Sequence, residues 1–396
     1  MRITRIECIP VQAPGRTLVP VVVDTDSGLC GVGEAGLQRR WQAVAGAVQH
    51  LEEWLVGQDP FRIEHLWQRM FRGGFYPGDR LIGSAIAAID IALWDLKAQA
   101  LGVPVYELLG GRCREYVEVF TAPDFLPEEA LREIVEIRRR IAETADPQAT
   151  AELARCCANC GHRYFRLGPP VWGNRLEARQ SVRQLIEQLR AVRAAVGDRL
   201  ELMVDLHTRL TPEEAVWFCG EVEPLQLFAV EDPIRSEHPA GYRQVRQRTR
   251  VPLAAGEQWA SKWEFRQAIE EEWIDYARVD LCIAGGLSEG KKIATLAETH
   301  LIKILPHNPL GPVCTAASLH LDLACDNAGP QEVLFSPATL LPEVFQCSFD
   351  LKDMALTLPE GPGLGVRFDR QAARRYPPEM TEPPHFARQD GSFTNY

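Results

Sequence analysis

The chain has 396 residues, enough for about two domains, and its 46% hydrophobic and 24% charged residues are ordinary for a globular protein. Its 43 basic and 54 acidic residues give a net charge of −11, and no basic block points to a nucleic-acid partner. No apolar run approaches the ~20 residues of a membrane helix, and the N-terminus lacks the apolar core of a signal peptide. We therefore expect a cytoplasmic protein without nucleic-acid or membrane partners.

The N-terminal hundred residues predict a strand, a hairpin and three helices. Residues 21–34 read as two strands joined by a turn, because a Gly-containing turn signal separates two apolar runs. Helical periodicity covers residues 41–56, 63–71 and 85–100. A loop rich in glycine, 73–79, separates the last two helices.

From about residue 116 the pattern changes to alternating strands and helices. Eight strands with helical or loop connections are the number found in a (β/α)8 barrel, so we predict an α/β fold of that type. The candidate strands are residues 117–121, 164–167, 202–205, 227–230, 253–255, 276–279, 303–305 and 331–334.

Polar residues stand at the ends of six of these strands. They are separated by 23 to 27 residues, about one strand–helix unit, which places them on the rim formed by the C-terminal strand ends, where such barrels keep their active sites. The six are Asp205, Glu231, Glu257, Asp280, His307 and Glu332.

The first three of these residues are acids that each follow an apolar run. Three carboxylates that meet on a rim repel one another unless they are protonated or bridged by a cation. Oxygen ligands suit a hard ion, Mg²⁺ before Zn²⁺, so Asp205, Glu231 and Glu257 are candidate magnesium ligands. The alternative is that they cap helices, which becomes weaker for three acids in consecutive units.

Two histidines are candidates for proton transfer. Asp280 can accept a hydrogen bond from one ring nitrogen of His307, which fixes the tautomer, raises the pKa and leaves the other nitrogen as a base; the alternative is a buried core histidine. His207 shares a face with Asp205 in an extended segment, so it is a metal ligand, a proton donor or a loop residue.

Glu332 and Arg166 are further candidates. Glu332 can hydrogen-bond a substrate oxygen or cap a helix. Arg166 ends the second strand, where it can bind a carboxylate or hydroxyl but cannot act as a base; the alternative is a solvated rim arginine. The eleven cysteines are interpreted as reduced thiols, and Cys156, Cys157 and Cys160 as helix thiols rather than zinc ligands, because no second Cys or His pair follows at zinc spacing.

Several segments resemble the enolase superfamily in its mandelate racemase branch, and the resemblance covers nearly the whole chain. Residues 88–97 (AIDIALWDLK) and 101–111 (LGVPVYELLGG) closely resemble the segment that joins the capping domain of this family to its barrel. Residues 362–366 (PGLGV) resemble the return into the capping domain. The resemblance implies a capping domain that begins in residues 1–116, a barrel in 117–335, and a C-terminal segment, 336–396, that returns to the cap.

The same resemblance implies roles for the rim residues. Asp205, Glu231 and Glu257 match the three Mg²⁺ ligands of the family, Asp280 and His307 match its catalytic dyad, and Glu332 matches a glutamate that hydrogen-bonds the enediolate. A Lys or His base that works with Mg²⁺ is a general feature of the superfamily, so this mechanism is implied by the resemblance. An even-numbered homo-oligomer is also implied.

Within the branch, the chain resembles D-galactonate dehydratases at residues 205–207 (DLH), 306–312 (PHNPLGP) and 390–392 (DGS). Mannonate dehydratases are similar at residues 207–212 and 231–233, but their Tyr base is missing from residues 168–180. The second strand ends in Arg-Leu-Gly and lacks the Lys of a racemase, so a mechanism with two bases is not expected.

These features predict the dehydration of an acid sugar, a small-molecule substrate, to a 2-keto-3-deoxy acid. His307 takes the α-proton, and His207 protonates the leaving hydroxyl. Trp259 packs on the sugar chain or is a structural aromatic. Two alternatives stay open: an epimerase, racemase or cycloisomerase on the same scaffold, and a pseudoenzyme that binds a metal and a sugar acid.

Overall fold

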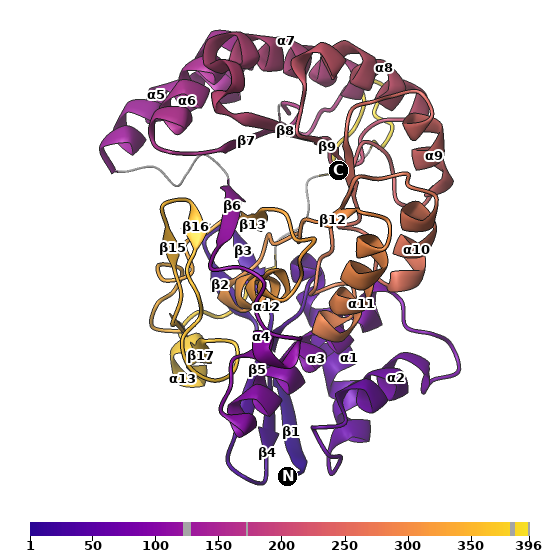
Figure 1. The fold of residues 1–396 in the computed structure, drawn as a ribbon, viewed down its shortest axis with the longest axis vertical. Coiled ribbons are helices and arrows are strands. Elements are labelled where there is room, and N and C mark those ends of the chain that lie inside the picture. The colour runs from indigo at the N-terminus through magenta and orange to yellow at the C-terminus, as the bar shows by residue number, and fades with distance from the viewer. Residues whose placement is uncertain (122–127, 172, 381–384, 395–396) are drawn as a thin grey trace. The chain divides into compact units, whose positions relative to one another are not determined.

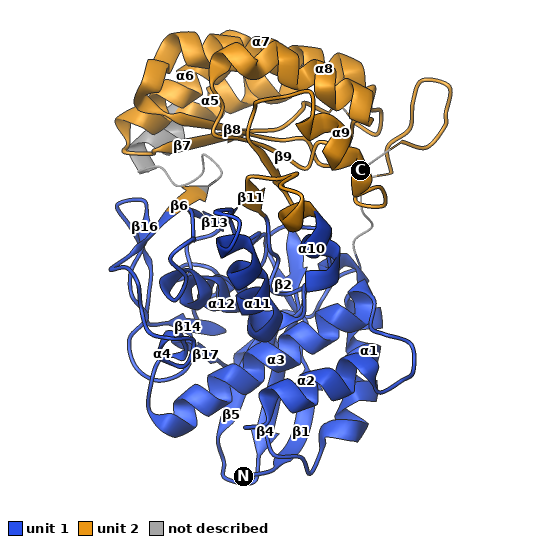
Figure 2. Ribbon diagram, turned by 45° about the vertical axis from the view of Figure 1, so that its right-hand side comes forward, with its two compact units in different colours: residues 1–118, 257–267, 278–382 blue, residues 119–256, 268–277, 383–396 orange. Residues whose placement is uncertain are grey.

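The structure, a computed structural model, describes residues 1–121, 128–171, 173–380 and 385–394. Contacts divide the chain into two compact units, coloured in Figure 2. Unit 1 comprises residues 1–118, 257–267 and 278–382, and unit 2 comprises residues 119–256, 268–277 and 383–396. Within the described ranges, no helix has both the length and the apolar character needed to cross a membrane.

Unit 1 begins with a three-stranded antiparallel sheet (Figure 1). Its order is β1 (Ile3–Cys8), β4 (Pro20–Thr25) and β5 (Cys30–Glu34), and a short hairpin of β2 (Val11–Ala13) and β3 (Arg16–Leu18) lies between β1 and β4 in the chain. The predicted hairpin over residues 21–34 is confirmed, with Val22 opposite Val32 in the register. Gly28 has a φ of 83°, a conformation that glycine adopts without strain, and so permits the tight turn.

Three helices pack with this sheet: α1 (Trp41–Leu55), α2 (Ile63–Arg72) and α3 (Arg80–Leu101). Their buried apolar side chains and those of the sheet form one hydrophobic cluster. The third helix begins five residues earlier than predicted, because the side chain of Asp79 accepts hydrogen bonds from the N–H groups of Leu81 and Ile82. Gly102 ends it in the left-handed conformation, with a φ of 72°.

Two glycines let β5 lie directly against α3. A Cβ atom at Gly31 would stand 2.0 Å from the carbonyl oxygen of Ala92, and one at Gly33 would stand 1.8 Å from that of Ala88. These distances are far inside van der Waals contact, so no larger residue fits unless the strand and helix separate. The sequence Cys-Gly-Val-Gly-Glu is therefore explained by close packing between the backbones of a strand and a helix.

The remainder of unit 1 contains short strands and further helices. The C-terminal part of unit 1 contacts α3 through Leu364, whose N–H donates to a carboxylate oxygen of Asp95 at 2.8 Å. The elements are α4 (Val105–Leu108), α11 (Gly286–Glu298), β12 (Lys303–Ile304), α12 (Pro312–Leu323), β13 (Gln331–Val333), β14 (Phe345–Cys347), β15 (Leu351–Lys352), β16 (Ala355–Leu356), β17 (Val366–Phe368), α13 (Arg370–Ala373) and the 3-10 turn Gln38–Arg40.

Unit 2 is built on parallel strands that are neighbours in chain order. They are β7 (Tyr164–Leu167), β8 (Glu201–Asp205), β9 (Ala229–Glu231), β10 (Leu253–Ala255) and β11 (Tyr276–Ala277). Helices precede or connect them: α5 (Glu128–Thr144), α6 (Pro147–Asn159), α7 (Ala178–Val196), α8 (Pro212–Val222) and α9 (Ala240–Arg246), with 3-10 turns at Gly197–Arg199 and Glu223–Leu225. A unit boundary falls inside β6 (Val117–Thr121) and another inside α10 (Lys262–Glu270).

All eight strands predicted after residue 116 are present as β6 to β13, although β11 and β12 have two residues each. Cys156 and Cys157 lie in α6 as predicted, and Cys160 caps it. No disulfide joins any of the eleven cysteines, all of which lie in the described ranges. The predicted domain limits after residues 116 and 335 stay predictions.

We expect Gly33→Ala to lower the free energy of unfolding by about 3 kcal/mol, because the new methyl group forces β5 away from α3. Gly46→Ala is a matched control, since Gly46 lies on α1 with nothing within 4 Å of an added Cβ. Replacing a glycine inside a helix should stabilise by roughly 0.5–1 kcal/mol. Urea unfolding of both variants tests the packing; equal stability of the two would contradict it.

Candidate active site

The register of the parallel sheet in unit 2 places two acids side by side. Asp205 ends β8, Glu231 ends β9, and the two residues are direct partners in the ladder between these strands. Arg166 of β7 is the partner of Met203, which shares a face with Asp205 because side chains alternate along a strand. The three polar side chains therefore project from one face at the C-terminal ends of neighbouring strands.

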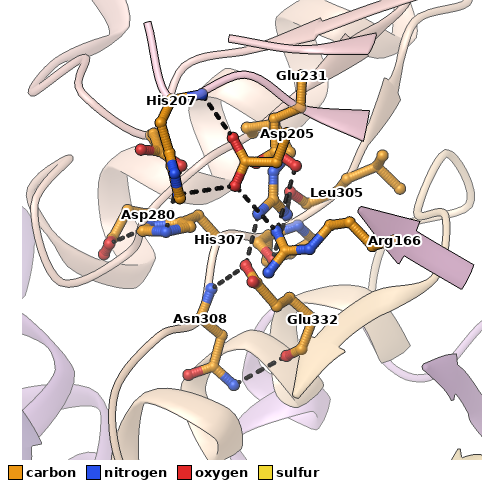
Figure 3. A network of polar contacts seen from close by, with 12 residues as sticks. Arg166, Asp205, His207, Glu231, Asp280, Leu305, His307, Asn308 and Glu332 are labelled. Atoms are coloured by element: carbon orange, nitrogen blue, oxygen red, sulfur yellow. Dashed lines mark hydrogen bonds and ion pairs between the residues drawn. The ribbon is translucent and has the colours of Figure 1, made fainter. Parts of the chain in front are cut away.

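Both acids are buried and have cationic neighbours. Asp205 is 5% exposed and Glu231 is fully buried. A guanidinium nitrogen of Arg166 lies 3.6 Å from a carboxylate oxygen of Asp205 and 3.3 Å from one of Glu231, and Nε2 of His207 lies 2.9 Å from Asp205 (Figure 3). Burial would raise the pKa of Asp205, but His207 and Arg166 hold it well below its usual range. The carboxylate of Asp205 is thus kept ionised by positive charge.

A turn in the left-handed conformation brings His207 back over Asp205. His207 and Thr208 have φ values of 48° and 57°, which are uncommon for residues other than glycine. The N–H of His207 donates to Oδ1 of Asp205 at 3.0 Å while its ring contacts Oδ2, so one residue contacts both carboxylate oxygens. Unusual backbone conformations of this kind concentrate at functional sites, which makes this turn a candidate site feature.

Glu257 completes the carboxylate triad at the strand ends. It follows β10 after Gly256 alone, and β10 is paired with β9 on the side opposite β8. Gly256 has a φ of 132°, which only glycine adopts readily, so the chain bends immediately before Glu257. One oxygen from each of Asp205, Glu231 and Glu257 lies within 4.8 Å of the others, and among the described residues this is the one such group of possible metal ligands. An all-oxygen, triply charged set fits a hard divalent cation.

Unit 1 holds the predicted dyad. Nδ1 of His307 lies 2.8 Å from Oδ2 of Asp280, whose other oxygen accepts the N–H of Cys282 at 2.8 Å. Nε2 of His307 lies 3.3 Å from a carboxylate oxygen of Glu257. When Nδ1 donates to Asp280, Nε2 is the nitrogen that can accept a proton, and it faces the third member of the triad.

Three carboxylates control the protonation of His307. Burial would lower the pKa of the ring, but the charge of Glu257, the hydrogen bond to Asp280 and the charge of Glu332 together raise it to about 10. The carboxylates therefore favour the protonated ring at neutral pH, and a cation bound at Glu257 would oppose this effect. The charge of Glu257 is the largest single cause that raises the pKa, and Asp280 raises it through both its hydrogen bond and its charge.

Arg278, which the sequence did not suggest, anchors both His307 and Glu332. Its fully buried guanidinium group donates to the carbonyl oxygens of Leu305 and Pro306 at 3.0 and 3.1 Å and forms an ion pair with Oε2 of Glu332. The N–H of Asn308 donates to the same Glu332 oxygen at 3.1 Å (Figure 3). Residues on both sides of His307 are thus tied to one buried ion pair, which we call the Arg278–Glu332 clamp.

The last predicted site residue is Trp259, which is 2% exposed. Its ring packs edge-on against Phe265, with the centroids 4.9 Å apart. This burial favours the alternative in which Trp259 is a structural aromatic.

Comparisons with known proteins connect this geometry to a family. Residues 11–110 match the N-terminal domain of mandelate racemase / muconate lactonizing enzymes, and residues 148–372 match the enolase C-terminal domain-like family. A D-mannonate dehydratase of Caulobacter sp. (strain K31) is 35% identical over 98% of each chain. A D-galactonate dehydratase family member of Halomonas elongata is 35% identical over the full length of both chains.

Solved structures agree with the sequence relatives. An enolase from Pantoea ananatis with bound D-gluconate and Mg is 28% identical, with a TM-score of 0.89 over 100% of this chain and 99% of that one. An enolase from Agrobacterium radiobacter with bound Na and L-malate is 29% identical, with a TM-score of 0.85 over the whole of both chains. The predicted fold class is confirmed: an α/β protein with an N-terminal capping domain and a C-terminal barrel domain.

We expect Arg278→Met to lower the free energy of unfolding by about 3–5 kcal/mol, because it leaves the carboxylate of Glu332 buried without its guanidinium partner. The double variant Arg278→Met/Glu332→Met should recover much of this loss, since it removes the uncompensated charge. Arg190→Met is the control: Arg190 pairs with Glu221 on the exposed surface, where a loss of at most about 1 kcal/mol is expected. Denaturant unfolding measures all three, and a double variant no more stable than the single one would contradict the clamp.

Proposed function

The chain belongs to the enolase superfamily, in its mandelate racemase / muconate lactonizing enzyme group, and we propose that it is a Mg²⁺-dependent dehydratase of an acid sugar. The proposal rests mainly on one contact between the candidate base and a candidate metal ligand. Nε2 of His307, whose Nδ1 binds Asp280, lies 3.3 Å from a carboxylate oxygen of Glu257. A base beside a cation site is the arrangement needed to remove a proton α to a carboxylate.

Asp205, Glu231 and Glu257 are the proposed ligands of Mg²⁺. The bound ion would polarise the substrate carboxylate and lower the cost of the negative charge that develops beside it. The buried carboxylate of Asp205 already has two positively charged or protonatable neighbours in the protein, Arg166 and His207. Arg166 is also the proposed contact for a substrate oxygen.

His307 is the proposed base and takes the α-proton on Nε2. Its hydrogen bond to Asp280 fixes the ring orientation and the tautomer. Glu332 is proposed to donate a hydrogen bond to a substrate oxygen as the enediolate forms, which requires that its carboxyl group carries a proton in that complex; its position is fixed by Arg278 and the N–H of Asn308. Preorganised groups of this kind stabilise developing charge without moving during the reaction.

His207 is the proposed acid. Its side chain is 42% exposed, and it contacts Asp205, a partner that stabilises the protonated ring. It would protonate the β-hydroxyl, which leaves as water when the carbon–oxygen bond breaks; the resulting enol then tautomerises to the 2-keto-3-deoxy acid. Arg166 lies in β7 where a second base would be needed for racemisation, and an arginine does not deprotonate in proteins.

The substrate class is an acid sugar, and we propose aldonates such as galactonate, gluconate or mannonate. Relatives of equal identity carry the names of a D-mannonate dehydratase and a D-galactonate dehydratase family member, and a structural neighbour binds D-gluconate. Packing of Trp259 on the sugar, the even-numbered homo-oligomer and the cytoplasmic location stay predictions.

The metal role is tested by Glu231→Gln. We expect it to abolish both Mn²⁺ binding, measured directly by calorimetry, and 2-keto product formation, because one of three carboxylate ligands loses its charge. Glu187→Gln is the control, since Glu187 lies exposed on α7. In the unmodified protein a chelator should stop turnover and Mg²⁺ should restore it; full turnover in excess chelator after dialysis would rule out the metal.

The separate roles of the histidines are tested with an acid-sugar substrate in D₂O. His307→Asn should lose both α-hydrogen exchange and product, because both depend on removal of the α-proton by His307. His207→Gln should still exchange the α-hydrogen but lose product formation by about 10²–10⁴-fold, the usual contribution of a general acid. His65→Gln, an exposed residue of α2, is the control.

Two outcomes would contradict these assignments. Exchange at the unmodified rate in His307→Asn would place the base elsewhere. Interconversion of two α-epimers by the unmodified protein without keto acid would replace the dehydratase by an epimerase.

A further inference from the structure

We propose that unit 2 carries a second small-molecule site, which binds the phosphate group of a phosphorylated metabolite. The site is a cleft of about 370 Å³ between the start of α7, the segments after β8 and β9, and the C-terminal residues 385–394. Its basic lining residues, Arg179, Arg209, Arg235 and Arg388, define what we call the arginine cleft. None of them belongs to the proposed catalytic set.

The arginine cleft concentrates positive charge in a chain whose net charge is −11. Four arginines and His238 line it, against two acids, Glu177 and Glu214. Both acids accept backbone N–H groups: Glu177 accepts that of Gln389 at 2.9 Å, and Glu214 caps α8 by accepting that of Thr211 at 3.0 Å. The lining residues thus comprise four arginines against two acids, an excess of positive charge that favours an anion.

Two of the arginines are held in place without losing their charge. The guanidinium group of Arg179 lies over the ring of Trp217, 5.2 Å from its centroid. Arg388 donates to Oγ of Ser392 and to the carbonyl oxygen of Phe393. An aromatic face and neutral oxygens orient a guanidinium group without pairing with its charge, and Asp390 acts on Arg388 only through its charge, so these two side chains can pair with an anion.

The other two arginines are more constrained. Arg209 is 9% exposed; it donates to the carbonyl oxygen of Pro169 at 3.2 Å and lies over the ring of Phe386. Arg235 forms a forked ion pair with Glu237. Glu237 thus balances the charge of Arg235, and Arg179 and Arg388 are the residues that we assign to direct contact.

The C-terminal residues are tied to the loop after β7, which gives the cleft a defined shape. The N–H of Ala387 donates to the carbonyl oxygen of Asn174 at 2.9 Å, and the N–H of Leu176 donates to that of Ala387 at 3.1 Å. This pairing carries Arg388 to the cleft from residues distant in the sequence. A ligand that bridges Arg179 and Arg388 would therefore join the C-terminal residues to α7 and stabilise the folded protein.

Size and chemistry both select the ligand class. The volume lies within the range of about 300–1,000 Å³ that is usual for small-molecule sites, larger than a single inorganic ion needs. Guanidinium groups bind phosphate through two parallel hydrogen bonds, and a phosphate monoester carries up to two negative charges. A sugar phosphate matches the cleft in both respects.

The test uses the Mg²⁺-loaded full chain and titration calorimetry at constant ionic strength. The probes are glucose 6-phosphate, which has no carboxylate for the proposed catalytic site, together with inorganic phosphate and malonate. We expect one molecule of glucose 6-phosphate to bind per chain, and Arg179→Gln or Arg388→Gln to weaken binding by about tenfold or more, because each removes a hydrogen bond between charged groups. Arg190→Gln, on the exposed face of α7, should bind as the unmodified chain does.

Several results would overturn the proposal. They are the absence of binding at millimolar glucose 6-phosphate, glucose 6-phosphate binding that Arg179→Gln and Arg388→Gln leave unchanged, and malonate binding that these variants weaken as much as they weaken glucose 6-phosphate binding. Binding of inorganic phosphate without binding of glucose 6-phosphate would also overturn it. Dehydratase turnover and circular dichroism of the two variants, expected to match the unmodified chain, show that they are folded. Because binding is measured without an acid sugar, its result is independent of the proposed reaction.

Discussion

Asp205 and Glu231 are neighbours in a parallel ladder, and much of the candidate site follows from that constraint. The ladder holds two buried carboxylates at adjacent strand ends, where their repulsion must be compensated. Arg166 and His207 supply positive charge within unit 2, and the left-handed turn at His207 and Thr208 brings the imidazole into contact. The third carboxylate, Glu257, adds charge that a divalent cation is suited to balance.

The segment that carries His307 is fixed from both sides by buried acids. On one side, Glu332 binds Arg278 and the N–H of Asn308. On the other, Glu34 accepts the N–H groups of Gly311 and Cys314 at 3.1 and 3.0 Å. Burial raises the pKa of Glu34 to about 7, against the effect of these hydrogen bonds. A base held at two points keeps its orientation towards Asp280, which preorganises it for proton transfer.

The sequence predicted the site as far as spacing and residue chemistry allow. Eight strands and six rim residues followed from a repeat of about one strand–helix unit, and the triad and the dyad occupy those strand ends. The contacts of Arg166 with Asp205 and Glu231 could not be predicted, because they depend on which strands are neighbours and in what register. The early start of α3 was missed because the Asp79 cap lies ahead of the apolar repeat.

Arg278 illustrates a different limit. A single arginine in a short strand segment is ordinarily a surface residue, so its charge argued against a buried role. The available signal was its place two residues before Asp280, which puts both side chains on one face of an extended segment. Its binding partners are two carbonyl oxygens and Glu332, which lie 27 to 54 residues away in the sequence. The sequence alone does not show that the fold brings these groups next to Arg278.

The ladder between β8 and β9 also determines where the chain can change in length during evolution. One residue inserted within β8 would turn the carboxylate of Asp205 to the opposite face, and no intermediate register exists. The connection between the two strands has no such restriction, because the entropy of closing a loop changes slowly with its length. Insertions and deletions that adapt an enzyme of this family to new sugars are therefore expected in the connections, while the strands that end in metal-ligand candidates keep a fixed length.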